Sequence, residues 1–247
     1  MNSLLVIRAL APSWDNDDTK NACLTIEQEL AQAPADAVIS RGRNTLTRLS
    51  IAGHEVVVKA FPAPRTLLKR IQRWGRASKA MRSYAHAERM LQLGISTPEP
   101  FAVIEANDGR AWYLCRFAAH YITAGRADAS DEMISALGQF LGRMHACGAF
   151  HYDATPGNFL LRTDDVNAPI LVVDCNRMRF GWVSAWAGTR SLMQLRNGDE
   201  RLLRSYCVAR GWSGGLIRKL YYVRWAWHHV AWACKNATRP LRRKCGI

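Results

Sequence analysis

The chain between residues 37 and 61 alternates short apolar runs with turn residues. Within the predicted strand 46–51, polar and apolar positions alternate over 48–51, and the three valines at 56–58 are followed by Lys59. Because a period of two and β-branched runs are typical of strands, this region is predicted to be strands joined by tight turns. A second pair of strands is expected at 101–105 and 112–117, and a short strand and a helix within 1–36.

Helical periodicity dominates the rest of the chain. Six apolar residues of 131–147 fall on one stripe: Met133, Ile134, Leu137, Phe140, Leu141 and Met144. A helix is also predicted over 66–93, with Gly94 at its end, and most of the chain after the short strands 159–161 and 170–173 is expected to be helical. Strands, one helix, strands and then helices are the order of an α+β fold with two lobes. We predict an N-terminal extension over 1–36, a β-rich lobe over 37–115 and a mostly helical lobe over 116–247.

The most informative motif is His151-Tyr-Asp153-Ala-Thr-Pro-Gly-Asn158, followed by an apolar run that ends at Asp174. Phosphotransferases of the protein-kinase fold have their catalytic loop and their magnesium-binding Asp in this arrangement. The pattern predicts an ATP- and Mg²⁺-dependent kinase. Asp153 would orient the acceptor hydroxyl and take its proton, and Asn158 and Asp174 would bind the metal.

Lys59 and Glu88 are the candidates for two further charged residues that a kinase active site needs. Lys59 closes a valine-rich strand, so its ammonium group could neutralise the nucleotide phosphates from a rigid position. Glu88 is the only acid of the predicted helix that follows, and it is expected to form the ion pair that holds Lys59 in place. The alternative for each is an ordinary surface residue. No G-x-G-x-x-G precedes Lys59, so the turn of Gly42, Arg43 and Asn44 is the candidate phosphate-binding loop.

Two sequence features of regulated protein kinases are missing, and this limits the class of substrate. Tyr152 stands where many protein kinases have an Arg that reads a phosphorylated activation loop. No Ala-Pro-Glu follows Asp174, which lies in Asp-Cys-Asn rather than Asp-Phe-Gly. Both departures disfavour a regulated protein kinase and favour a kinase that acts on a small molecule or a glycan.

The net charge of +14 is concentrated in two segments without acidic residues. Residues 62–87 carry seven Lys or Arg, and residues 201–247 carry eleven. Such segments suggest contact with phospholipid headgroups, a phosphorylated glycolipid or nucleic acid; the alternative is a solvated basic face without a partner. No apolar run approaches the roughly 18 residues of a membrane span, and no signal peptide is recognisable, so a cytoplasmic protein is expected. The seven cysteines form no C-x-x-C pair, which predicts scattered reduced thiols.

The last segment also has an amphipathic pattern. Leu216, Leu220, Val223, Trp227 and Val230 follow helical spacing, and basic residues continue beyond them to Lys244. Trp225, Trp227 and Trp232 could anchor this helix at a membrane interface, or they could pack on the helical lobe.

Several stretches resemble the lipopolysaccharide core kinases, the Kdo and heptose kinases and their relatives, and are most similar to the short Bacteroidetes-type members. They are Gly42-Arg43-Asn44, Val58-Lys59, Gly94-Ile-Ser-Thr-Pro-Glu-Pro100, the catalytic loop, and Asp174-x-Asn-Arg177-Met-Arg179-Phe-Gly181. The resemblance covers residues 37–215. It implies a kinase-like fold, ATP with Mg²⁺, and transfer of the γ-phosphoryl group to a sugar hydroxyl of the inner core. The acceptor would be a lipid A-linked glycolipid at the cytoplasmic face of the inner membrane.

Arg177 and Arg179 follow the predicted metal Asp, and we expect them to bind a carboxylate or phosphate of the acceptor. Two other kinds of protein stay possible at this point. One is a small-molecule or protein kinase of the same fold. The other is a non-catalytic kinase-fold protein that binds membrane or nucleic acid. Such a protein would be expected to have lost Lys59, Asp153 or Asp174, and all three are present. Nucleic acid is not the expected partner.

Overall fold

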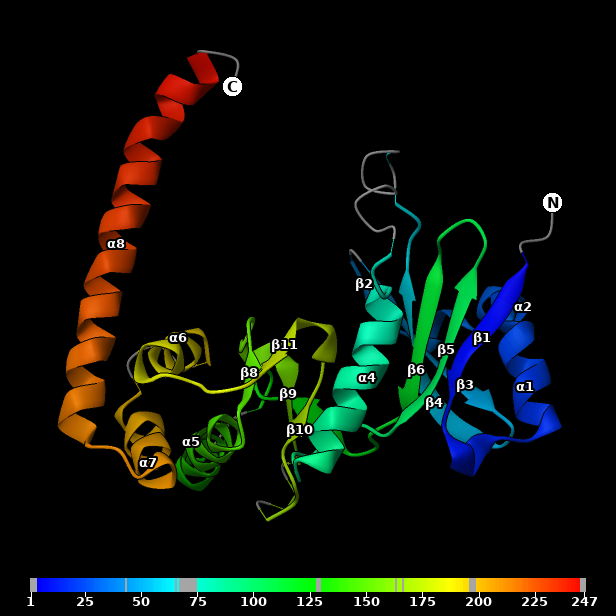
Figure 1. Ribbon diagram of the computed structural model, residues 1–247, viewed down its shortest axis with the longest axis horizontal. Coiled ribbons are helices and arrows are strands. Elements are labelled where there is room, and N and C mark those ends of the chain that lie inside the picture. The colour runs from blue at the N-terminus through cyan, green and yellow to red at the C-terminus, as the bar shows by residue number, and fades with distance from the viewer. Residues whose placement is uncertain are drawn as a thin grey trace. The chain divides into compact units, whose positions relative to one another are not determined.

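The computed structural model describes residues 4–42, 44–64, 66, 75–127, 130–162, 164–165, 167–195 and 199–244, with backbone alone at 232 and 234–244. The chain divides into two compact units. Unit 1 is Met1–Tyr121 with Leu171–Met178, and unit 2 is Ile122–Ile170 with Arg179–Ile247. Each unit is described separately (Figure 1).

Unit 1 is built on a six-stranded sheet with the order β1-β5-β6-β4-β3-β2 (Figure 1). The strands are β1 (Leu5–Leu10), β2 (Val38–Arg41), β3 (Thr45–Ile51), β4 (His54–Phe61), β5 (Pro100–Ala106) and β6 (Ala111–Arg116). The strands predicted within 37–61 and at 101–105 and 112–117 are therefore confirmed. Neighbouring strands are antiparallel, from β1–β5 to β3–β2.

Alternation along β5 and β6 divides the core of unit 1 between the two faces of the sheet. Ala102 and Ile104 pack in a cluster with residues of α1 (Asp17–Leu24) and α2 (Ile26–Gln32). Val103 and Tyr113 instead pack with Ala80 and Tyr84 of α4 (Lys79–Gln92). The period of two thus places two helices on one face and α4 on the other.

The N-terminal segment corrects the predicted domain division. Residues 1–36 are not a separate extension, because β1 pairs with β5 and forms the edge of the six-stranded sheet. The predicted helix over 66–93 is present as α4 from Lys79, with Ser78 as its N-cap, whereas positions 65 and 67–74 lie outside the described residues. Gly94 follows α4 with φ of +71°, as a helix-ending glycine requires.

Unit 2 is mostly helical, and it begins after Tyr121 rather than at 116. Its helices are α5 (Asp131–Ala146), α6 (Ala185–Leu195), α7 (Glu200–Arg210) and α8 (Gly214–Lys244). Short strands accompany them: β7 (Tyr121–Thr123), β8 (Ala149–His151), β9 (Phe159–Arg162) and β11 (Met178–Phe180). The predicted helix over 131–147 is confirmed, and its buried stripe contains all six predicted apolar residues.

Glycines allow α5 and α7 to approach closely. A Cβ atom at Gly138 would lie 2.5 Å from the carbonyl oxygen of Leu202, and one at Gly142 would lie 2.6 Å from Cβ of Ala209. The helices pack around Tyr206, which is fully buried. α8 in turn packs on α6 and α7 (Figure 1).

Candidate active site

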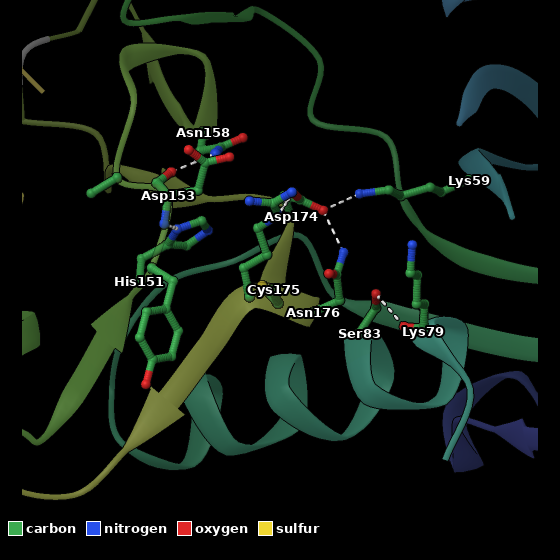
Figure 2. A network of polar contacts seen from close by, with 12 residues as sticks. Lys59, Lys79, Ser83, His151, Asp153, Asn158, Asp174, Cys175 and Asn176 are labelled. Atoms are coloured by element: carbon green, nitrogen blue, oxygen red, sulfur yellow. Dashed lines mark hydrogen bonds and ion pairs between the residues drawn. The ribbon is translucent and has the colours of Figure 1, made fainter. Parts of the chain in front are cut away.

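Lys59 lies near the middle of the sheet of unit 1. It pairs with Leu46 of β3 and Tyr113 of β6, so its backbone is fixed on both sides. Its side chain is 14% exposed, and its Nζ donates to Oδ1 of Asp174 in an ion pair. Figure 2 shows this contact. The predicted cation is thus held at one position by a rigid strand and by a carboxylate from a segment 115 residues later.

Asp174 is the centre of the polar network of unit 1. Oδ1 also accepts a hydrogen bond of 2.5 Å from Nδ2 of Asn176 (Figure 2). Oδ2 lies 3.7 Å from Nε of Arg177. The residue has φ 59° and ψ 41°, the left-handed conformation that non-glycine residues rarely adopt. Such strain, which costs on the order of 1–3 kcal/mol, concentrates where a side chain must point in one particular direction.

The segment around Asp174 is held by residues that the sequence did not identify. Val172 of β10 (Leu171–Val172) donates its N–H to the carbonyl of Ser96 at 3.0 Å, and its own carbonyl accepts from Oγ1 of Thr97 at 2.7 Å. Nδ1 of His86 on α4 lies 2.8 Å from the carbonyl oxygen of Cys175. The Gly-Ile-Ser-Thr-Pro stretch therefore has a structural reason: it fixes the strand that leads to Asp174.

The predicted ion pair between Lys59 and Glu88 is not formed. Glu88 is exposed on α4 and interacts with Tyr84, one turn earlier on the same helix. Burial first, and then Glu88, raise the pKa of Tyr84 to about 12. The buried face of α4 carries small residues such as Ala80, Ser83 and Ala87 in place of a carboxylate. Lys59 is paired with Asp174 instead. Figure 2 shows that Lys79 and Ser83 are the labelled residues of α4 next to this ion pair.

The candidate phosphate loop joins β2 and β3. Gly42 and Asn44 flank the turn, and Arg43 lies outside the described residues. A Cβ atom at Gly42 would meet only the carbonyl oxygen of Asn44, at 3.9 Å. Its own surroundings therefore do not require glycine at this position, and a role of the turn in binding phosphates stays a prediction.

The residues of the catalytic-loop motif, all in unit 2, are hydrogen-bonded to one another. His151 is fully buried at the end of β8, and its Nδ1 accepts from the backbone N–H of Asp153 at 3.0 Å. Nδ2 of Asn158 donates to the carbonyl of Asp153 at 2.7 Å (Figure 2). His151 therefore supports the loop, as expected, and the Asp153 backbone is held by residues on both sides of it.

A second support for the loop comes from α6. Oε1 of Gln194 accepts from the N–H of Ala154 at 3.2 Å, and its Nε2 lies 3.5 Å from the carbonyl oxygen of Tyr152. Nη2 of Arg190 donates to the same carbonyl at 3.1 Å. These two side chains thus contact the backbone on either side of Asp153. No local motif marks them, since they lie about forty residues further along the chain.

The two arginines predicted to bind the acceptor differ in their surroundings. Arg177 contacts Asp174 in unit 1, as described above. Arg179, in unit 2, donates from Nη2 to the carbonyl of Trp182 at 3.2 Å and lies 5.7 Å from the ring centroid of Phe150. Both side chains are exposed. Their role toward an acceptor stays a prediction.

Each unit by itself contains oxygen donors of the kind that a hard divalent cation accepts. In unit 1 the Asp174 carboxylate has two oxygens, and in unit 2 the Oδ1 atom of Asn158 makes no hydrogen bond within the described residues, whereas its Nδ2 donates to the Asp153 carbonyl. Carboxylate and amide oxygens are the ligands that Mg²⁺ accepts, alongside water and phosphate oxygens. Lys59 would contribute charge neutralisation and Asp153 a proton acceptor, which are the protein contributions that phosphoryl transfer needs.

The fold is that of known structures, although sequence comparison finds no relative. No protein-family model and no curated protein sequence matches the chain. A solved structure of WaaP in complex with acyl carrier protein matches with a TM-score of 0.59 and 17% identity, covering 92% of this chain and 97% of that one. A candidate aminoglycoside phosphotransferase from Ralstonia eutropha JMP134 matches with a TM-score of 0.49 and 11% identity, over 76% and 80% of the two chains. The chain has the α+β protein-kinase-like fold that its sequence predicts.

Proposed function

We propose that the protein is an ATP-dependent kinase that transfers the γ-phosphoryl group to a sugar hydroxyl of the lipopolysaccharide inner core. The observation that carries this proposal is the pairing of Lys59 with Asp174, because it joins the two residues that the kinase motifs predict from opposite halves of the chain. A kinase-fold protein without catalysis would have little reason to keep both charges together in a partly buried site.

Each of these residues has a separate role in the proposed phosphoryl transfer. Lys59 would neutralise the phosphates of ATP. Asp174 of unit 1 and Asn158 of unit 2 would each offer an oxygen ligand to Mg²⁺, which supplies charge neutralisation at the transferred group when it is bound. Asp153 orients the acceptor hydroxyl and takes its proton. His151, Asn158 and Gln194 restrict the Asp153 backbone, and such positioning is the larger part of the protein's contribution in this reaction class.

The choice of acceptor rests on three features. The motif stretches resemble the Kdo and heptose kinases, with the short Bacteroidetes-type members as the nearest group. The match to WaaP extends over nearly the whole of both chains. Residues 201–247 contain eleven Lys or Arg and no acid, which suits an anionic glycolipid and disfavours a cationic acceptor.

Peripheral contact with an anionic membrane is the second part of the proposal. No helix among the described residues is long and apolar enough to cross a bilayer. α8 nevertheless carries an exposed apolar stripe at helical spacing: Leu216, Val223, Trp227 and Val230 are 52%, 60%, 71% and 59% exposed. An apolar stripe with Trp on a basic helix is the pattern of a helix that lies in a membrane interface. The cytoplasmic face of the inner membrane is the proposed location.

The test is a transfer assay with γ-labelled ATP, Mg²⁺ and three acceptors: lipid-linked core from a strain lacking this gene, an aminoglycoside, and a generic protein substrate. The proposal expects label in the glycolipid with wild type and none with the Asp153→Ala variant. Label in the aminoglycoside or the protein, with none in the glycolipid, would assign a different acceptor class. Failure to bind ATP would support a non-catalytic protein.

A further inference from the structure

Unit 2 contains an open groove between α6 and α8 with a volume of about 860 Å³. Ligand pockets in proteins span roughly 300–1,000 Å³, so the space suits a sugar-sized group. Its lining includes Arg190, Met193 and Gln194 of α6 and Arg224, His228 and His229 of α8. The lining residues include no Asp or Glu.

The groove begins where the inner face of α8 changes from apolar to basic residues. Ile217 and Tyr221 are buried, and Arg224 and His228 follow them at helical spacing. An apolar contact would continue the helix packing here, but the sequence places a cation instead. The exposed stripe of Leu216, Val223, Trp227 and Val230 runs next to this face of the helix, and Trp227 belongs to both the stripe and the lining of the groove.

Arg224 is held firmly in the groove. Its Nε donates to Oγ1 of Thr189 at 2.9 Å, and its Nη2 donates to the carbonyl of Trp186 at 2.6 Å. The guanidinium lies 3.9 Å from the ring centroid of Trp186. Since a guanidinium has five N–H donors, these contacts orient the group and leave donors for a ligand.

The positive charges of the groove are not compensated. Neither Arg190 nor Arg224 forms an ion pair with a carboxylate in the described part of the chain. Both side chains line the same groove, and burial and then the charge of Arg190 lower the pKa of Arg224. Two adjacent cations that lack a carboxylate are the arrangement that binds phosphate or carboxylate, often in a bidentate manner.

Hydrogen bonds connect the groove to the catalytic loop. Arg190 donates to the carbonyl of Tyr152, and Gln194 contacts this carbonyl and the N–H of Ala154, so two groove residues contact the backbone on either side of Asp153. A ligand bound between α6 and α8 is therefore close to the residue that would activate an acceptor hydroxyl.

We propose that this groove is the acceptor site, in which Arg190 and Arg224 bind a phosphate or carboxylate group of the sugar substrate. The inference rests on the proposed function and specifies it: the preferred acceptor carries an anionic group next to the sugar that receives the phosphoryl group. Arg177 and Arg179 do not line the groove, and the assignment does not depend on them.

The first experiment measures KM for deacylated core oligosaccharide and for ATP in wild type, Arg190→Gln and Arg224→Gln. Loss of one charge-assisted hydrogen bond should raise the oligosaccharide KM by about 10- to 100-fold, with the KM for ATP within about two-fold of wild type. The matched control is Arg143→Gln, which removes the same charge from an exposed position of α5 outside the groove. Equal increases in both KM values, or the same increase in the control, would overturn the assignment.

Two further variants keep the test decisive. Arg190 is exposed, so Arg190→Gln remains informative if Arg224→Gln fails to fold. Because Gln194 also contacts the Tyr152 carbonyl, kcat of Arg190→Gln should fall less than its oligosaccharide KM rises. Arg224→Lys retains charge without the forked geometry and should be intermediate between wild type and Arg224→Gln.

Direct binding separates this inference from the proposed function. If wild type transfers no label to any core acceptor, the proposed function is wrong. The groove is then tested by calorimetric titration with the deacylated oligosaccharide in the absence of ATP. Binding that Arg190→Gln weakens supports the groove, whereas no binding, or binding that both variants leave unchanged, contradicts it. Phosphatidylglycerol vesicles form the second arm, and a loss confined to vesicle binding would assign the arginines to lipid headgroups instead.

Discussion

His145 lies on α5, one turn before the chain enters β8 and the catalytic loop. It is 1% exposed, and its Nδ1 lies 3.0 Å from the Tyr206 hydroxyl. Its ring also packs against Phe150, with centroids 5.5 Å apart. Burial, and then the charge of Arg210, lower the pKa of His145 from 6.5 to about 3. The folded protein therefore keeps this imidazole neutral at every pH where it functions.

This shift makes stability fall in mild acid. Above the unfolded pKa of 6.5 neither state binds the proton, so the group has no effect there. As the pH falls below 6.5, the unfolded chain binds a proton that the folded chain cannot, and folding loses free energy until the pH nears 3. At pH 5 the difference is 1.5 pH units, which corresponds to about 2 kcal/mol. That is a large part of the roughly 5–15 kcal/mol that stabilises a typical domain.

The assay is urea unfolding, followed by circular dichroism, at pH 7 and pH 5. His145→Asn removes the titrating group and can still hydrogen-bond Tyr206. Wild type should lose about 2 kcal/mol more than this variant between the two pH values. Tyr206→Phe should keep the pH dependence of wild type, because burial is the first cause of the shift. If wild type and His145→Asn lose the same free energy, His145 is not neutral in the folded protein and the reasoning fails.

Three further predictions test the site, the core and the surface. In a coupled ATP assay, Glu88→Gln should leave kcat/KM within about two-fold of wild type, whereas Asp174→Asn should lower it by at least about 100-fold. Comparable losses in the two variants would show that Glu88 does belong to the active site. Gly138→Ala should destabilise the protein by about 1–3 kcal/mol, since its Cβ would lie 2.5 Å from a backbone oxygen. Gly215→Ala, which would meet only Ser213 Oγ at 3.7 Å, is the control in the same urea titration, and equal losses would contradict the packing. Trp227→Gln should reduce cosedimentation with phosphatidylglycerol vesicles without changing ATP affinity. Unchanged cosedimentation would contradict the proposal that the exposed stripe of α8 contacts a membrane.

The sheet and the catalytic loop could be predicted because their signals are local. The alternation of polar and apolar residues over 48–51 and the three valines before Lys59 are local signals of strands, and both strands are present. The spacing from Asp153 to Asn158 is short enough to be recognised from the residues alone. Both residues lie in one hydrogen-bonded loop, as that spacing suggests.

Other parts of the site depend on information that no local pattern carries. Glu88 is the only acid of its predicted helix, which makes it the candidate partner of Lys59, but the rotation of α4 turns Ser83 and Ala87 inward and Glu88 outward. Arg190 and Arg224 lie on separate helices, and only the packing of α6 against α8 brings them together. The pairing of β1 with β5 likewise joins segments about a hundred residues apart, so the first residues could not be assigned to the sheet beforehand.

The most direct test of the account is the mass of the lipid A-core isolated from a strain that lacks the gene and is complemented with wild type or with Asp153→Ala at equal expression. The account predicts that wild type adds one phosphate group to an inner-core sugar and that Asp153→Ala adds none. A core of identical mass in both strains, with wild-type protein present and folded, would contradict the proposal that the protein phosphorylates lipopolysaccharide.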